Sequence, residues 1–306
     1  MQNIYFYTII GIYVIFFIFD KFVDYLNTLN WSPKLPEEAK GIYDEEKYAK
    51  SQDYEKTKFS FSKITSTFSF VLMLLILSFG GFGILDSFLR NYISNPILLS
   101  LAFFGIIILA QTIISLPFSY YSTFVIEEKF GFNKMTMKIF IIDSIKSLIL
   151  TMILGGIISS VIIYLYIIFG TNFWILARIF MASISLFFTM FYSSLIVPLF
   201  NKQTPLEDGE LKTSINNFAQ KVGFKLDNIF VIDGSKRSSK ANAYFTGIGA
   251  KKRIVLYDTL INDLTTDELV AVLAHEIGHY KKKHVWQMII ISTIETGFML
   301  FLFSLM

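Results

Sequence analysis

The chain carries the stretch TTDELVAVLAHEIGHY at residues 265–280, which has the signature of a helix that bears a metal site. Thr265 and Glu268 have the spacing of a capping box, which predicts that a helix begins at this point. Apolar residues then recur every three to four positions, as they do along the buried face of an amphipathic helix. We therefore expect a helix over about 265–281.

Two histidines and a glutamate within this helix predict a zinc site. His275 and His279 are four residues apart, so on a helix they lie on one face and can reach one ion. Neutral imidazole is a good ligand for Zn²⁺. Glu276 follows the first histidine, where its carboxylate can take a proton from a metal-activated water. We assign Zn²⁺ as the cofactor, His275 and His279 as metal ligands, and Glu276 as the catalytic base.

The third histidine is interpreted differently. His284 lies nine residues after His275, which on a continuous helix is about 180° around the axis. It would then face away from the pair formed by His275 and His279. We interpret His284 as an interfacial histidine and not as a ligand.

The composition predicts a mainly α, polytopic membrane protein. Hydrophobic residues make up 54% of the chain and the mean hydropathy is +0.55, well above the values of soluble domains. A bilayer-spanning helix needs about 20 apolar residues. Asp86, Arg178 and Glu295 lie in or near such runs, and we interpret them as helix-end or paired charges, with a functional role as the alternative. The expected spans are 4–19, 64–89, 96–119, 147–169, 174–198 and 285–305.

The distribution of basic residues predicts the orientation. Eight Lys lie in 20–63, four in 120–146, and thirteen Lys and Arg in 199–284. By the positive-inside rule these three segments face the cytoplasm. The net charge is only +3, so no nucleic-acid partner is indicated, and the absence of cysteine excludes a cysteine nucleophile.

Three regions follow from this pattern. Residues 1–198 form an N-terminal transmembrane region of about five spans, with cytosolic loops at 20–63 and 120–146. Residues 199–284 form a small α+β, zincin-like cytosolic domain. Residues 285–306 form a sixth span.

The polar region predicts short strands before the metal-site helix. An edge strand beside such a helix can pair with an extended peptide substrate, which suits a protease. A helix is expected at 206–222, and strands at 228–232, 242–246 and 253–257.

Four stretches of the chain carry a resemblance to a known family. The sequence resembles the CAAX prenyl endopeptidase (type I CAAX prenyl protease) family of integral-membrane zinc metallopeptidases, over essentially its whole length. The stretches are FVIEEKFGFN at 124–133, IVPLFNKQTPLEDGEL at 196–211, SSKANAYFTG at 238–247 and VAVLAHEIGHY at 270–280.

The resemblance implies a fold, an activity and a substrate strand. It implies a ring of transmembrane helices around a hydrophilic chamber, with the metal at the cytosolic end. It implies cleavage near the C-terminus of isoprenylated CAAX-like or other membrane-associated proteins, so the expected partners are a peptide or protein substrate and the lipid bilayer. Asn242, Ala243 and Tyr244 match the family's substrate-strand motif; an ordinary edge strand with aromatic packing is the alternative.

The family's third zinc ligand is a glutamate beyond a further membrane span. Glu295 is the only acid after His279 and lies 16 residues on, about 24 Å along a continuous helix. It cannot reach the same ion. We expect the third ligand beyond Met306, in a longer protein of which this chain is the N-terminal part. We also expect this chain by itself to hold zinc weakly and to cleave little.

Other classes of protein fit parts of the pattern. One alternative is an HtpX-type membrane quality-control metalloprotease, which typically has fewer spans before the motif. An intramembrane site-2-type protease carries the motif within a hydrophobic span, whereas polar residues flank it here. A degenerate, non-catalytic membrane scaffold is the third alternative. The expected location is a bacterial inner membrane, or the endoplasmic reticulum in a eukaryote, with the peptidase domain facing the cytoplasm.

Overall fold

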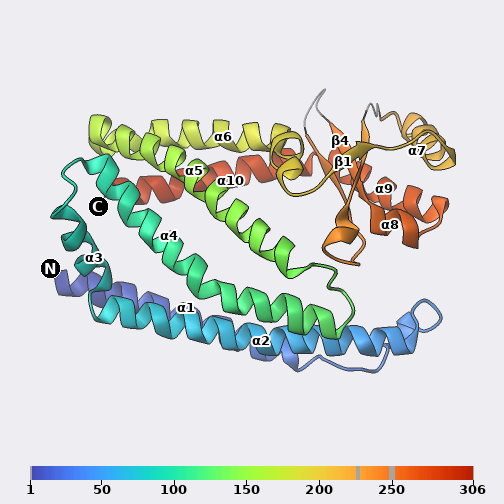
Figure 1. Cartoon of the computed structure of the whole chain (residues 1–306), viewed down its shortest axis with the longest axis horizontal. Coiled ribbons are helices and arrows are strands. Elements are labelled where there is room, and N and C mark those ends of the chain that lie inside the picture. The colour runs from blue at the N-terminus through green and yellow to red at the C-terminus, as the bar shows by residue number, and fades with distance from the viewer. Residues whose placement is uncertain (1, 225–227, 248–251, 306) are drawn as a thin grey trace. The chain divides into compact units, whose positions relative to one another are not determined.

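A computed structural model describes residues 2–224, 228–247 and 252–305 of the chain (Figure 1). The chain divides into two compact units, Met1–Phe130 and Gly131–Met306.

The regular elements described in the first unit are all helices, joined by turns and one isolated bridge between Lys40 and Tyr43. Within the segment 20–63, expected as a cytosolic loop, α1 continues to Thr28 and α2 begins at Glu45. The Asp44 carboxylate caps α2 by accepting a hydrogen bond from the Lys47 N–H at 2.8 Å, as helix N-caps do. The elements are α1 (Gln2–Thr28), η1 (Glu37–Ala39), α2 (Glu45–Ser78), α3 (Gly81–Arg90), α4 (Pro96–Tyr121) and a π-helical turn η2 (Ser122–Glu127).

The single span expected at 64–89 is wrong. Helix α2 ends at Ser78 and α3 begins at Gly81. Gly80 between them has φ 65°, in the left-handed region, which glycine adopts without steric cost and which stops a helix. The apolar run is therefore divided between two helices.

The second unit combines three long apolar helices with a small sheet domain. Helices α6 and α10 pack along each other, as Figure 1 shows. The elements are α5 (Met137–Phe169), η3 (Gly170–Asn172), α6 (Phe173–Leu195), η4 (Val197–Leu199), β1 (Gln203–Pro205), α7 (Glu210–Lys221), β2 (Ile229–Ile232), η5 (Gly234–Lys236), β3 (Ala243–Thr246), β4 (Arg253–Tyr257), α8 (Asp258–Asp263), α9 (Thr266–Lys281) and α10 (His284–Ser304).

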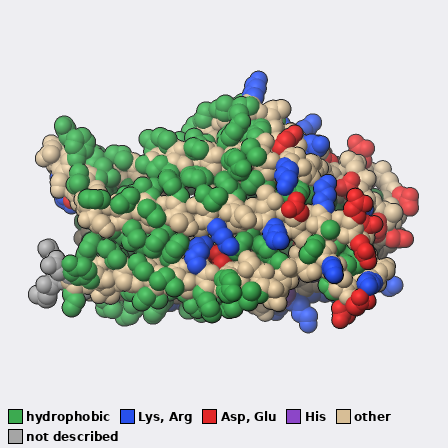
Figure 2. All heavy atoms as spheres, turned by 90° about the horizontal axis from the view of Figure 1, so that it is seen from below, with side chains coloured by type: hydrophobic (Ala, Val, Ile, Leu, Met, Phe, Trp, Pro, Cys, Tyr) green, Lys and Arg blue, Asp and Glu red, His purple; other side chains and the backbone are tan. Residues whose placement is uncertain are grey.

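Five segments of the described chain are long and apolar enough to cross a membrane. One of them, Met137–Leu199, contains both α5 and α6 and so accounts for two of the six expected spans. Hydrophobic side chains cover much of the helical surface seen in Figure 2; on α5, for example, Ile149, Ile153 and Ile157 are each more than half exposed. Exposing so much apolar surface to water is unfavourable, whereas contact with lipid covers it. The segments are Phe6–Thr28, Glu45–Ser78, Pro96–Glu127, Met137–Leu199 and His284–Ser304.

The sheet places an edge strand beside the metal-site helix. Its strand order is β1-β2-β4-β3, with β2 and β4 parallel and the other two pairs antiparallel. The three strands expected from the sequence are confirmed, whereas the three-residue β1 was not expected. Ile254 and Leu256 of β4 are fully buried against Leu269 and Leu273 of α9. This core fixes α9 on one face of the sheet, with β3 at the edge.

Candidate metal centre

Helix α9 presents its histidines to solvent because its other face is buried. The expected capping box is confirmed: the Thr265 hydroxyl accepts from the Glu268 N–H, and the Glu268 carboxylate accepts from the Thr265 N–H at 2.8 Å. Leu269, Leu273 and Ile277 recur at intervals of four and are each at most 2% exposed. His275 and His279 lie on the opposite, exposed face. The local sequence thus dictates both the start of the helix and the direction of its two histidine side chains.

The two imidazoles converge on one point. The Nε2 atoms of His275 and His279 lie 3.0 Å apart. Two nitrogens bound at 2.0–2.1 Å to a tetrahedral zinc ion are about 3.3 Å from each other. The pair therefore fits two positions of such an ion with a movement of a few tenths of an ångström.

His284 is not where a continuous helix would put it. The chain breaks between α9 and α10, and Lys283 at the break has φ 57°, a left-handed conformation that is uncommon for residues other than glycine. Helix α10 begins at His284, whose Nδ1 lies 2.8 Å from the Nδ1 of His279. The expectation that His284 faces away from the pair is therefore wrong. It contacts the ring nitrogen of His279 that does not face His275.

A cleft of about 460 Å³ opens beside these groups. Glu276 and His279 reach it from α9, Phe245 from β3 and Ser185 from α6. The remaining wall is mostly the apolar start of α10, so the cleft has one polar, titratable side and one apolar side. The α10 residues that line it are His284, Val285, Met288, Ile289 and Ser292.

The expected substrate strand has a register that the sequence did not reveal. Ala243 and Phe245 pack toward the α9 side of the sheet, and Phe245 lines the cleft. Tyr244 points to the opposite side, against Val197 and Val255, where burial raises the pKa of its phenol. None of Asn242, Ala243 and Tyr244 lines the cleft, so a substrate could engage them through the main chain of the strand edge.

No third metal ligand joins the histidines within residues 2–224, 228–247 and 252–305. His284 approaches Nδ1 of His279 and not the space between the two Nε2 atoms. Glu295 is exposed on α10, about three turns after His284. This part of the chain supplies two candidate ligands, His275 and His279, and the carboxylate of Glu276.

Comparisons with known proteins cover almost the whole chain. The family model described as CAAX prenyl protease N-terminal, five membrane helices, matches residues 24–202, and that of peptidase family M48 matches residues 205–306. CAAX prenyl protease 1 of Saccharomyces cerevisiae is 41% identical over 300 residues, which are 94% of this chain and 66% of the yeast protein. The human CAAX prenyl protease 1 homolog is 34% identical, over 89% of this chain and 66% of its own length.

A solved structure agrees with these matches. The crystal structure of S. mikatae Ste24p superposes with a TM-score of 0.90 at 41% identity, covering 96% of this chain and 71% of that one. The chain thus spans 66% of the length of the yeast and human relatives. These relatives are eukaryotic, so the expected bacterial membrane finds no support. The chain is a multi-pass integral membrane protein and belongs to the CAAX prenyl protease 1 family of M48 metallopeptidases.

Proposed function

We propose that this protein is a zinc-dependent membrane endopeptidase that cleaves near the C-terminus of prenylated, CAAX-like substrates. The observation that carries the proposal is the convergence of the His275 and His279 Nε2 atoms beside Glu276, at a cleft bordered by an edge strand. Family membership supports it, because M48 peptidases are metallopeptidases. The names of the relatives support the substrate class.

His275 and His279 would hold the metal through Nε2. When bound, zinc would lower the pKa of a coordinated water to about 7 and polarise the scissile carbonyl. A catalytic zinc normally takes three protein ligands, and this arrangement supplies two of them.

Glu276 would carry the proton. Its carboxylate lines the cleft next to His279 and is only partly exposed, so it can accept a proton from the attacking water. The same carboxyl group can then release that proton to the leaving amine. One residue thereby serves both halves of the hydrolysis.

His284 would set the tautomer of His279. For Nε2 of His279 to offer a lone pair to the metal, the proton must sit on Nδ1. The Nδ1 of His284, at 2.8 Å, can accept a hydrogen bond from that N–H. Such outer-shell contacts orient ligand rings and tune their basicity.

The apolar wall of the cleft suits a lipid-modified substrate. Val285, Met288 and Ile289 extend from the histidines along a predicted membrane span, so a chain that leaves the metal site can follow them into the bilayer. The free edge of β3 would pair with the extended peptide. We propose that this site faces the cytoplasm, as the basic residues of 199–284 indicate.

The test compares Glu276→Gln with the wild type, both as the full-length protein that the gene encodes and both purified in detergent with zinc in the buffer. Bound zinc is measured by mass spectrometry, and cleavage is measured on a farnesylated CAAX peptide and its unprenylated counterpart. We expect Glu276→Gln to hold as much zinc as the wild type and to lose cleavage. His275→Ala should lose both.

Each other outcome counts against the proposal. Cleavage by Glu276→Gln would rule out Glu276 as the general base. Cleavage of the unprenylated peptide alone would overturn the substrate class. A zinc-loaded wild-type protein that cleaves neither peptide would favour the non-catalytic scaffold.

A further inference from the structure

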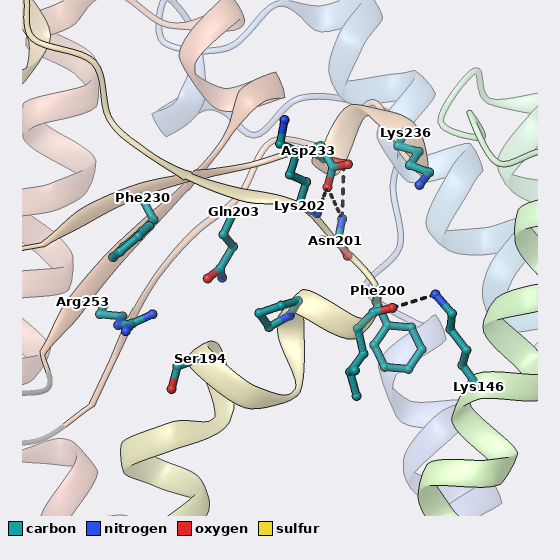
Figure 3. A pocket seen from close by; sticks show the side chains of 12 residues that line it. Lys146, Ser194, Phe200, Asn201, Lys202, Gln203, Phe230, Asp233, Lys236 and Arg253 are labelled. Atoms are coloured by element: carbon teal, nitrogen blue, oxygen red, sulfur yellow. Dashed lines mark hydrogen bonds between the residues drawn. The ribbon is translucent and has the colours of Figure 1, made fainter.

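A second hollow lies on the other side of the sheet domain from the metal-site cleft, and the two share no lining residue. Its volume is about 620 Å³, within the range of small-ligand sites. Figure 3 shows side chains from the end of α6, from β1, β2 and β4, and from α5 around it. The proposed peptidase mechanism uses none of them.

Positive charge dominates the walls of this hollow. Lys146, Lys202, Lys236 and Arg253 line it, together with one carboxylate, that of Asp233. That carboxylate already accepts hydrogen bonds from the Lys202 backbone N–H at 2.8 Å and from the Asn201 amide at 3.1 Å. Asp233 therefore holds the loop between α6 and β1 in place.

None of the four cations has an acidic partner among the described residues. Within the described ranges, no carboxylate lies within ion-pair distance of Lys202, Lys236 or Arg253. The Arg253 guanidinium lies over the Phe230 ring, 4.8 Å from its centroid, which holds it at the wall and leaves its N–H groups for another acceptor. Lys146 differs only in having a neutral partner, because its Nζ donates to the Leu199 carbonyl at 2.7 Å. Like charges held around one space repel each other unless an anion enters.

The hollow lies where the apolar helices meet the polar domain. After Lys146, α5 contains no charged residue up to its end at Phe169. After Arg178, the chain contains no charged residue until Lys202. Lys146 and Lys202 are thus the first charges beyond two membrane-spanning stretches, at the depth of lipid headgroups.

An apolar rim completes the site. Pro198 and Leu199 line the same hollow, and Leu199 is 47% exposed. A free phosphate ion has nothing to place against such a rim, whereas a lipid has its glycerol and acyl chains. Basic pockets at the cytoplasmic ends of membrane helices are where anionic headgroups bind.

We infer that this hollow binds the phosphate headgroup of an anionic membrane lipid, with Arg253, Lys202 and Lys236 as its cationic contacts and Leu199 against the lipid's apolar part.

The experiment measures lipid binding to the purified protein by native mass spectrometry from detergent, with phosphatidic acid, phosphatidylcholine and inorganic phosphate as probes. The test variant is Lys202→Gln with Arg253→Gln. The matched control is Lys138→Gln with Lys221→Gln, which removes the same charge from exposed positions that do not line the hollow. We expect at least a tenfold weaker phosphatidic acid affinity in the test variant and less than a twofold change in the control.

The other outcomes overturn the inference. Equal losses in both variants would mean diffuse surface attraction. Equal affinity for phosphatidylcholine and phosphatidic acid would remove the charge selectivity. If inorganic phosphate binds in the hollow and displaces the lipid at equal concentration, the hollow is a site for a soluble phosphate and not for a lipid headgroup. If the Arg253 variant does not fold, Lys202→Gln with Lys236→Gln, both at exposed positions, should still weaken binding, and no change there would overturn the inference.

Discussion

The Arg178 side chain of α6 lies directly over Gly297 of α10: a Cβ added to Gly297 would stand 2.6 Å from the arginine Cδ and 2.9 Å from its Nε. The absence of a side chain at Gly297 is what lets the arginine cross the interface between these two apolar helices. Small residues allow close approach in membrane bundles. The charge expected near this span is therefore accommodated inside the helix pair.

Replacing Gly297 by valine should separate α6 from α10. We expect a loss of about 1–3 kcal/mol in unfolding free energy, as for other overpacked sites, measured by thermal denaturation in detergent. Gly156→Val on α5 is the matched control, because no atom other than the adjacent residues and the nearby backbone of α5 lies within 4 Å of a Cβ there. Combining Gly297→Val with Arg178→Ala should recover part of the loss. Equal destabilisation by both valine variants would refute the steric explanation.

Replacing His284 by phenylalanine should weaken zinc binding while leaving both ligands in place. The ring is kept, but the nitrogen that accepts from His279 is lost, so we expect a 10- to 100-fold increase in the zinc dissociation constant, as for other outer-shell partners. Competition with a chelator measures it without any cleavage assay. Trp286→Phe, two residues further along α10, serves as the control. An unchanged zinc affinity in His284→Phe would mean that the contact does not position His279.

The capping box of α9 should make the sheet domain sensitive to acid. Hydrogen bonds from the Thr265 backbone N–H and hydroxyl hold the pKa of Glu268 below its ordinary value. A depressed carboxyl pKa stabilises the fold above the ordinary value of about 4.3, and that contribution is lost as pH falls through the folded-state pKa.

Thermal denaturation between pH 3 and pH 7 tests this. The difference in melting temperature between wild type and Glu268→Gln should be largest near neutral pH and shrink on acidification. A constant difference across the range would contradict the assignment. Thr265→Ala should cost about 1 kcal/mol at neutral pH, as for other N-caps.

Asp143 and Arg237 should tie the start of α5 to the sheet domain. The Arg237 Nε donates to the Asp143 carboxylate at 2.8 Å, and both side chains are 18% exposed. The arginine Nη2 also donates to the Phe200 carbonyl at 2.7 Å. Removing one partner of such a pair leaves a charge that is poorly solvated.

We therefore expect Asp143→Asn to cost about 1–3 kcal/mol of stability, and Arg237→Lys to cost a similar amount, because lysine cannot make both contacts at once. Lys129→Gln, whose partner Asp53 is exposed at 3.4 Å, should change stability little. A similar loss in all three variants would show that the pair is no more important than a surface contact.

Local patterns predicted the metal-site helix and the strands, because both are determined by residues close in sequence. The capping box and the spacing of Leu269, Leu273 and Ile277 fix α9 in place. The two helix breaks were predicted only in part, for different reasons. The sequence around Gly80 is a continuous apolar run, and its hydropathy carries no information about the left-handed backbone of one residue. The expected helix end at 281 and the expected span from 285 allowed for a break, but the left-handed conformation of Lys283 is unusual for lysine. His284 was placed as on a continuous helix, and that position was wrong.

The face on which each strand residue lies could not be predicted either. A shift of one residue exchanges the two faces of a strand, and Tyr244 and Phe245 are both large and aromatic. Only the packing of β3 against α9 decides that Phe245 reaches the cleft. The cationic hollow escaped notice for a similar reason, since Lys146, Lys202 and Arg253 are far apart in sequence and the fold brings them together.

The turn at Lys282 and Lys283 sets the position of His284 relative to the two histidines of α9. Only these two residues separate the helix that carries His275 and His279 from the helix that begins at His284. An inserted residue would change the length and direction of this turn and so move His284 relative to His279. The length of this turn therefore sets how far the apolar helix α10 begins from the histidine pair of α9.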